Sequence, residues 1–162
     1  MKVPLRYLPK GLSRKDKQKQ VRMLSKSRKL YKKHQYYTRK AVPSFKSKPS
    51  GHVANARKIY KVENISPNRE LSKATGCSLS ALQKIVKKGE GAYFSSGSRP
   101  NQTAHSWGYA RLASAVTGGK AAAVDYKILE EGCDHSKRAF RLARSAKAKY
   151  GYGQGKTKKV KV

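Results

Sequence analysis

Negative charge is what this sequence has least of. Only 8 of its 162 residues are Asp or Glu, against 39 Lys and Arg, so the formal net charge at pH 7 is +31. Repulsion among so many cations works against a compact chain on its own, and it favours a polyanion or an acidic protein surface as a partner. Because the sequence also offers no nucleophile–base pair, we expect a protein that is not an enzyme.

Long apolar runs are missing as well. No stretch approaches the roughly 18 apolar residues of a membrane span, and residues 1–17 lack the uninterrupted apolar stretch of a signal peptide. Cysteine is limited to Cys77 and Cys133, which are too few for a disulfide framework. We therefore expect no such framework and a reducing, intracellular setting.

Motifs for metals and phosphate loops are incomplete. His105, His135 and the two cysteines include no pair at the spacing of zinc ligands. The Gly119-Lys120 pair resembles the end of a phosphate-binding loop, but Ser114 occupies the required upstream Gly position and Ala121 the Ser/Thr position. We expect neither a metal ion nor a cofactor.

The cations that are present gather at the two ends of the chain. Residues 1–61 hold 20 Lys and Arg and one acid, residues 62–135 hold 9 and 7, and residues 136–162 hold 10 and none. We predict a basic N-terminal arm with one helix (1–61), a small helical domain (62–135), and a basic C-terminal helix and tail (136–162). We expect both extensions to gain order from contact with a partner.

Local signals predict a mainly α protein. Ser13 followed three residues later by Asp16 resembles a capping box, and Pro43 and Pro49 indicate an extended path between helices. Glycines mark most of the remaining helix ends. We expect helices at residues 12–33, 67–75, 79–88, 104–116, 120–131 and 135–149, a short helix or strand within 53–65, and a disordered Lys-rich tail at 151–162.

Residues 70–85 have the pattern of a helix-turn-helix corner. Small Ser72, turn Gly76 and capping Ser78 have the required spacing. In a DNA-binding use, the second helix would present polar and basic residues to a groove or its phosphates, namely Ser80, Gln83, Lys84, Lys87 and Lys88. The alternative is a corner that only builds the core, and the spacing is common to both.

Two further segments have features of anion or nucleic-acid binding. Residues 35–50 alternate aromatic and basic side chains, which suit base stacking and phosphate contact, or equally an extended strap whose aromatics fill protein pockets. The polar loop 96–103 precedes Trp107 and places Arg99 and Arg111 around a helix start, which could bind an anion or only cap a helix and pack Trp107 in the core. The candidate contact residues are Arg14, Lys15, Lys17, Lys19, Arg22, Lys26, Arg28, Lys29, Tyr36, Tyr37, Arg39, Lys40, Gln83, Lys84, Lys87, Lys88, Arg99 and Arg111.

Several stretches resemble a known family. Residues 6–20, 30–48 and 91–133 are similar to a small basic domain of uncharacterised function that large eukaryotic double-stranded DNA viruses of the phycodnavirus and giant-virus groups encode. The similarity covers roughly residues 5–135, and the run from SGSRPNQT (96–103) to SWGYARLAS is its most specific part. The resemblance brings no catalytic residues with it.

The resemblance implies a virion as the setting. It leads us to expect a minor capsid protein on the inner face of an icosahedral shell, which bridges capsomers through its basic arms and contacts the major capsid protein and other minor capsid proteins. A virion DNA-binding or packaging protein is the alternative, because basic arms would also neutralise the phosphates of viral DNA. A ribosomal-type RNA binder fits the composition, but the resemblance does not imply one.

Overall fold

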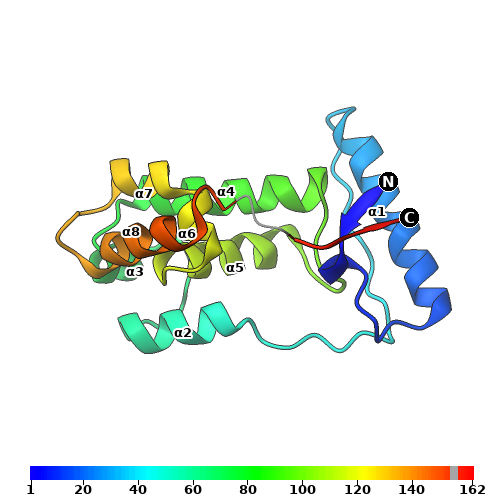
Figure 1. Cartoon of the computed structure of the whole chain (residues 1–162), viewed down its shortest axis with the longest axis horizontal. Helices are drawn as coiled ribbons and strands as arrows, with labels where there is room; N and C mark the ends of the chain where they lie inside the picture. The colour runs from blue at the N-terminus through cyan, green and yellow to red at the C-terminus, as the bar shows by residue number, and fades with distance from the viewer. Residues whose placement is uncertain (154–156) are drawn as a thin grey trace. The chain divides into compact units, whose positions relative to one another are not determined.

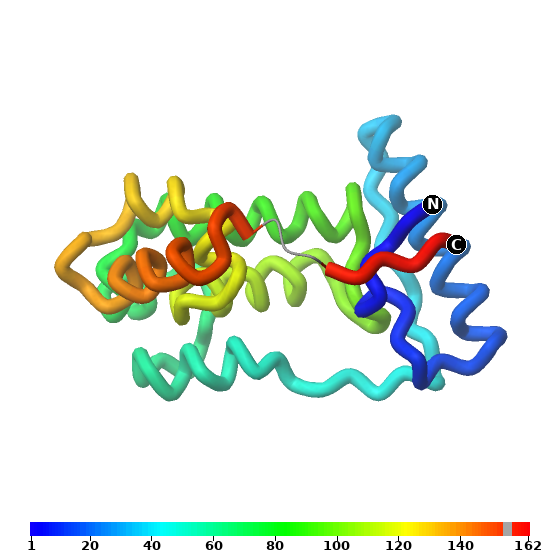
Figure 2. Tube along the Cα trace, viewed as in Figure 1, coloured from blue at the N-terminus to red at the C-terminus, as the bar shows by residue number. Residues whose placement is uncertain are grey.

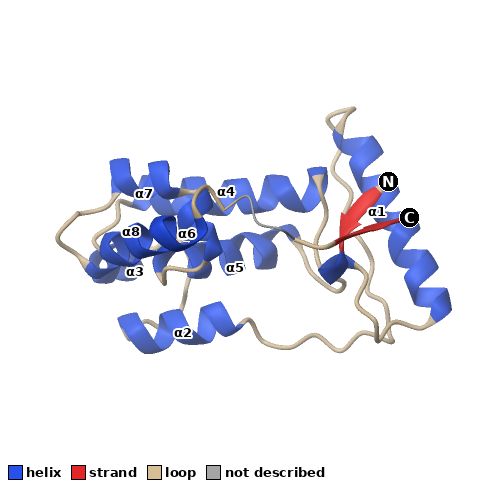
Figure 3. Cartoon of the chain, in the orientation of Figure 1, coloured by secondary structure: helices blue, strands red, loops and turns tan. Residues whose placement is uncertain are grey.

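The chain is mainly helical, as the sequence predicts (Figure 1). The computed structural model describes residues 1–153 and 157–162. Short strands are the only other regular structure in this part of the chain (Figure 3). In chain order the elements are β1 (Lys2–Pro4), the 3-10 helix η1 (Leu5–Tyr7), α1 (Arg14–Tyr31), α2 (Gly51–Tyr60), α3 (Arg69–Thr75), α4 (Leu79–Ser95), α5 (Ala104–Val116), α6 (Lys120–Val124), α7 (Tyr126–Gly132), α8 (Arg138–Tyr150) and β2 (Lys159–Lys161).

The described residues form two compact units, each assembled from separate stretches of chain. Unit 1 comprises residues 1–48, 90–107 and 157–162, and unit 2 comprises residues 49–89 and 108–153. The boundary falls inside two continuous helices, between Gly89 and Glu90 in α4 and between Trp107 and Gly108 in α5. Contacts within each unit therefore join residues that are distant in sequence.

Unit 1 is organised around α1 and the two ends of the chain. The Ser13 hydroxyl accepts a hydrogen bond from the backbone N–H of Asp16 at 3.1 Å, so the predicted helix start is confirmed. Strand β1 pairs antiparallel with β2, which brings the two termini side by side (Figure 2). A small core lies beneath them, made of Val3, Tyr7, Leu8 and Leu24 with Val21 and Trp107 at its edge.

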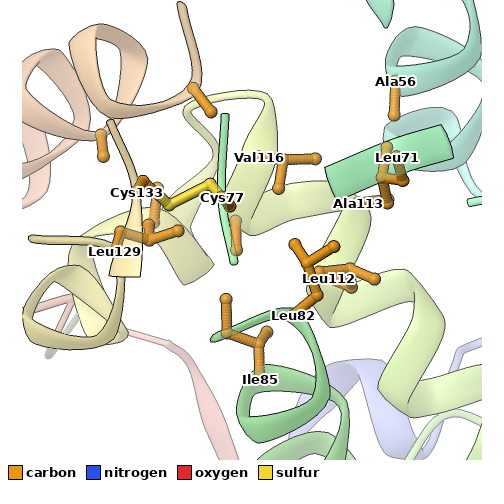
Figure 4. Close-up of a cluster of buried hydrophobic side chains, with 14 of the residues drawn as sticks. Ala56, Leu71, Cys77, Leu82, Ile85, Leu112, Ala113, Val116, Leu129 and Cys133 are labelled. Carbon is orange, nitrogen blue, oxygen red and sulfur yellow. A yellow bond between two sulfur atoms is a disulfide. The ribbon is translucent and has the colours of Figure 1, made fainter. Parts of the chain in front are cut away.

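Unit 2 contains the larger core. Helices α2, α3, α5, α6, α7 and α8, with the first part of α4, contribute to a cluster that includes Leu71, Leu82, Leu112 and Leu129 (Figure 4). Burying side chains of this size stabilises a fold by roughly 1.5–3 kcal/mol each. The long apolar faces of α4 and α5 supply much of this cluster.

The two cysteines are bonded to each other, which the sequence did not predict. Cys77 and Cys133 form a disulfide with an S–S distance of 2.04 Å, visible at one side of the core cluster (Figure 4). Their backbones also form an isolated antiparallel bridge. Cysteine number alone did not indicate this bond, because it carries no information on how the fold brings together two segments 56 positions apart.

Several predicted boundaries need correction. Helix α4 does not stop at Gly89 but continues to Ser95. The single helix expected at 120–131 is two, α6 and α7, which separate at the buried Asp125. Helix α3 begins at Arg69 and not at the predicted residue 67, because Asn68 accepts the capping hydrogen bond from Leu71 N at 2.8 Å.

The outer segments are more ordered than predicted. The short element expected within 53–65 is a helix, α2, and α5 and α8 lie close to their predicted places. The tail expected to be disordered contains β2, because its residues complete a ladder with β1. Residues 154–156 of that predicted tail lie outside the described residues.

A candidate polyanion-binding surface

A stripe of cations follows one side of α1. Lys15, Lys19, Arg22, Lys26 and Lys29 recur at intervals of three and four residues, so the periodicity of the helix places them on one face. A shallow groove runs along this face, lined by Arg22, Ser25, Lys26, Lys29, Leu30 and Lys33. We refer to these five cations and Lys33 as the α1 stripe. Lys33 was not among the predicted contact residues.

The opposite side of α1 holds the helix in unit 1. Its buried residues are Asp16, Gln20, Met23, Leu24 and Ser27. The Asp16 carboxylate, the single acid of residues 1–61, accepts a hydrogen bond from Ser44 N at 2.8 Å. Hydrogen bonds from Ser44 hold the pKa of Asp16 below its usual value. Asp16 is therefore ionised at neutral pH. Its carboxylate is hydrogen-bonded to the backbone of Ser44 on the buried side of the helix.

The remaining α1 cations have varied surroundings. Arg14 and Lys17 are exposed, whereas Arg28 is only partly so. The Arg28 Nε donates to the carbonyl oxygen of Ser96 at 2.8 Å. In the stripe itself, Lys19 Nζ donates to the carbonyl oxygen of Ala41 at 3.1 Å. The cations of α1 that are available to a polyanion are therefore mainly the exposed ones.

Aromatic side chains adjoin the end of α1. The Tyr36 ring lies 6.2 Å from that of Tyr31 and 5.1 Å from that of Phe94, centroid to centroid. Despite these neighbours, Tyr36 is 69% exposed. The Lys26 Nζ lies 4.4 Å from the ring centroid of Tyr37, so a stripe cation contacts the residue next to Tyr36. Phe94 could not have been assigned to this cluster from sequence spacing.

The extended segment after α1 is fastened to unit 1 by Arg39. Its guanidinium is buried and donates to Ser27 Oγ at 2.9 Å, to the carbonyl oxygen of Tyr93 at 2.8 Å and to Ser98 Oγ at 2.8 Å. It also lies over the Tyr93 ring at 3.8 Å. Arg39 was predicted to contact a partner, and the structure instead places it inside the fold, because three internal acceptors satisfy it.

Asn101 completes this attachment. Its amide oxygen accepts from Val42 N at 2.7 Å, and its amide nitrogen donates to the carbonyl oxygen of Phe45 at 2.9 Å. The prediction that this segment gains order only from a partner is wrong, since it is packed on residues of its own unit. Lys40 remains exposed on the segment.

The helix-turn-helix-like corner has the predicted local geometry. Gly76 ends α3 with φ +76°, where a Cβ would also lie 2.5 Å from Lys137 Cγ. The Ser72 hydroxyl donates to the carbonyl oxygen of Cys77 at 2.5 Å, and Ser78 caps α4 by accepting from Ala81 N at 3.1 Å.

The start of α4 is covered by the end of α7. Ser78 N donates to the carbonyl oxygen of Gly132 at 2.7 Å, and a Cβ on Gly132 would lie 2.5 Å from that of Ala81. A recognition helix needs its first turns free to enter a groove. This contact therefore favours the core role over groove reading. Ser80, Gln83, Lys84 and Lys87 are nevertheless exposed.

Arg111 and Lys88 share one buried carboxylate. Arg111 donates twice to Asp125, with Nε and Nη2 each 2.8 Å from a carboxylate oxygen, and Lys88 Nζ lies 3.6 Å from the same group. The Asp125 side chain is fully buried. Arg111 is thus occupied by an internal ion pair, while Arg99 is exposed. Trp107 packs at the edge of the unit 1 core beside Tyr7.

A second cationic face lies on α8 in unit 2. Ala139, Phe140, Ala143 and Ala146 are buried on one side of this helix. Three arginines at three-residue intervals are exposed on another, namely Arg138, Arg141 and Arg144. The sequence predicted a basic helix here but no contact residues. The sequence signal for this face was the helical spacing, which places the arginines and the buried alanines on different sides of the helix.

Metal sites and membrane spans were also sought. Within residues 1–153 and 157–162, His, Cys, Asp and Glu side chains nowhere form a group of three that could hold a metal ion. No helix among those described has both the length and the apolar character needed to cross a bilayer.

Comparison with known proteins adds one match. The model of a family of unknown function, DUF5824, matches residues 4–138. No curated protein and no solved structure matches this chain.

Proposed function

For this chain, which belongs to the DUF5824 family of unknown function, we propose a role as a non-enzymatic structural protein of a virion. In this proposal it is a minor capsid protein on the inner face of a large icosahedral DNA virus shell. The virion setting rests on the resemblance of residues 5–135 to a domain of such viruses. The mode of action rests on the charge and on where the fold exposes it.

One observation carries the proposal: each compact unit has its own core and its own cationic helix. In unit 1 this helix is α1, and in unit 2 it is α8. Each has a buried side toward its own unit and exposed cations elsewhere. A chain with two such helices has the means to bind two acidic neighbours at once, which is what bridging capsomers requires.

Two separate binding faces matter because single surface ion pairs contribute little. An exposed pair adds roughly 0–1 kcal/mol, and salt screens it. Joining two binding faces in one chain makes the second contact intramolecular, and the combined affinity then exceeds either alone. Bridging would in this way use exposed cations that are individually weak.

Particle incorporation tests the proposal. A variant with Arg138→Glu and Arg141→Glu alters α8, and one with Lys26→Glu and Lys29→Glu alters α1. We expect each to reduce the amount of protein in purified virions at least about fivefold, since each removes one of two linked contacts. The matched control is Lys58→Glu with Lys73→Glu, two exposed cations of unit 2 outside both helices, and it should enter particles normally.

Absence of the wild-type chain from purified virions would contradict the virion role. Equal loss of incorporation in the control and in the two helix variants would contradict the assignment of α1 and α8 as the contact faces.

A virion DNA-binding or packaging role is the second candidate. The α1 stripe favours it, because regularly spaced exposed cations suit a phosphate backbone as well as an acidic protein. Binding to nucleic acid would then show a steep dependence on salt.

A further inference from the structure

We infer that the α1 stripe binds single-stranded nucleic acid, with Tyr36 stacking on an unpaired base. This deepens the second candidate function by naming the form of nucleic acid that α1 binds, and it rests on the proposed function only in taking α1 as a contact face. All residues involved belong to unit 1.

The spacing of the stripe suits a phosphate backbone. Neighbouring cations are three or four residues apart, which is about 4.5–6 Å along a helix that rises 1.5 Å per residue. From Arg22 to Lys29 the exposed cations follow one another with no gap longer than four residues, whereas Lys19 is half-buried and donates to the carbonyl oxygen of Ala41. A strand that follows this part of the helix would therefore meet a cation at each turn. Such contacts bind the backbone without reading sequence.

The composition of the groove supports backbone contact as well. Its lining contains four cations, Arg22, Lys26, Lys29 and Lys33, with Ser25 and Leu30 as the other members. It includes no carboxylate, and Asp16 is on the buried side of the helix with its hydrogen bonds to Ser44. No Asn or Gln is present to read base edges.

Tyr36 distinguishes a single strand from a duplex. Its ring has Tyr31 and Phe94 as neighbours and is tilted 58° and 54° to their rings, yet 69% of the residue is exposed. Proteins that bind single strands combine exposed aromatic rings, which stack on bases, with cationic grooves, which contact the backbone. Bases within a duplex are stacked on each other and offer no face to such a ring.

Lys26 connects the groove to the segment that carries Tyr36. Lys26 lines the groove, and its Nζ also lies 4.4 Å from the ring centroid of Tyr37. A strand could thus contact the stripe with its phosphates and Tyr36 with a base at the end of α1. An acidic protein segment would use the same cations but would gain nothing specific from Tyr36.

The test measures binding of a labelled oligothymidine strand and a labelled duplex of equal length by fluorescence anisotropy across a salt series, with the full-length chain. We expect Tyr36→Ala to weaken strand binding about 5- to 100-fold and duplex binding less than about twofold. Tyr36→Phe keeps a stacking ring and should retain wild-type affinity. Urea unfolding of each variant checks that unit 1 remains folded.

A charge-matched pair of variants tests the stripe. Arg22→Gln with Lys26→Gln and Lys29→Gln should weaken strand binding at least about tenfold and lower the slope of log affinity against log salt by about 2. Lys58→Gln with Lys73→Gln and Lys127→Gln removes as many exposed cations from unit 2. It should lower the slope by less than half as much.

Wild-type strand affinity in Tyr36→Ala would overturn the inference, as would equal losses in the two triple variants or tighter binding to the duplex than to the strand. Exclusion of the α1 variants from particles with unchanged strand binding would overturn it too, and would leave an acidic protein as the partner of α1. Failure of the virion role alone would show as normal strand binding by a protein absent from particles.

Discussion

Arg39 shows how a cation that looks available in the sequence can serve the interior. Three internal acceptors and the Tyr93 ring surround its guanidinium, and burial lowers its pKa. An ammonium group cannot reproduce a planar fork with five N–H donors. A lysine at position 39 would keep the positive charge but would lose hydrogen bonds that only the guanidinium can make.

Arg39→Lys should destabilise the protein by about 2–4 kcal/mol, because buried acceptors lose their donors while the charge stays buried. Urea denaturation followed by circular dichroism measures this. Arg99→Lys is the control on an exposed residue of the same unit and should change the free energy of unfolding by less than about 0.5 kcal/mol. If Arg39→Lys changed the free energy of unfolding by as little as the control, the internal role of Arg39 would be contradicted.

Tyr60 links stability to alkaline pH. It is buried, and its hydroxyl donates to the carbonyl oxygen of Val116. Burial raises the pKa of Tyr60 to about 12 from an ordinary value of 10.0. The folded state thus holds this proton more tightly than the unfolded state. Its contribution is complete below pH 10 and is lost as pH rises from about 10 to about 12.

Tyr60→Phe should cost about 0.5–1.5 kcal/mol near neutral pH, where the hydrogen bond is intact. Between pH 9.5 and 11.5 the variant should lose less stability than the wild type, because one ionising group with a raised pKa is gone. Urea midpoints at several pH values check this. Parallel pH profiles for the two proteins would show that Tyr60 does not titrate as its surroundings suggest.

At the scale of elements, helix α4 contains two glycines that have different surroundings. A Cβ on Gly89 would lie 2.6 Å from Gly108 Cα, whereas a Cβ on Gly91 would meet nothing within 4 Å. Gly89 therefore permits close approach of α4 and α5 in unit 2. Gly91 lies in the helix without such a requirement.

Gly89→Ala should destabilise the protein by at least about 1 kcal/mol, because backbone atoms must move to admit the methyl group. Gly91→Ala should stabilise it by about 0.5–1 kcal/mol through helix propensity. Thermal melts of the two variants provide the comparison. Stabilisation by both substitutions would mean that the two helices have room between them at Gly108.

The elements that sequence reasoning located are those with local signals. Ser13 and Asp16 mark the start of α1, and Gly76 marks the turn before α4. The misplaced boundaries depend on distant partners. Gly89 lies inside α4 and faces Gly108 closely, and Asp125 lies between α6 and α7 and binds Arg111, which is 14 positions away.

The same distinction applies to the candidate site. The cations on α1 follow from helical periodicity, so their common face was predictable from residues 14–31. The roles of Arg39 and Arg111 were not, because each is decided by acceptors from remote segments. Phe94 joins Tyr36 for the same reason. Local pattern located the charges, and tertiary contacts decide which of them face solvent.

At the scale of the molecule, the disulfide fastens the turn after α3 to the end of α7 within unit 2. Its two cysteines are 56 residues apart, and both are buried. Closing a loop of this length restricts the unfolded chain, which stabilises the folded one by about 2–4 kcal/mol. The bond thus supports a unit whose surface cations repel one another.

Reduction, or the double substitution Cys77→Ala with Cys133→Ala, should lower the thermal midpoint by several degrees, in line with a loss of about 2–4 kcal/mol. Differential scanning calorimetry with and without reductant measures the effect. The double variant provides the control, because reductant should leave its midpoint unchanged. A reductant effect of equal size in that variant would assign the loss to something other than this bond.

The pairing of β1 with β2 also has a consequence for biosynthesis. Unit 1 needs the strand at 159–161 to complete its sheet, and that strand is synthesised long after its partner β1 at residues 2–4. All of unit 2 has been translated before then. The first strand of the basic N-terminal segment therefore keeps one edge unpaired until residues 159–161 have been synthesised. In that interval the edge is available for pairing with chaperones or with a neighbouring nascent chain.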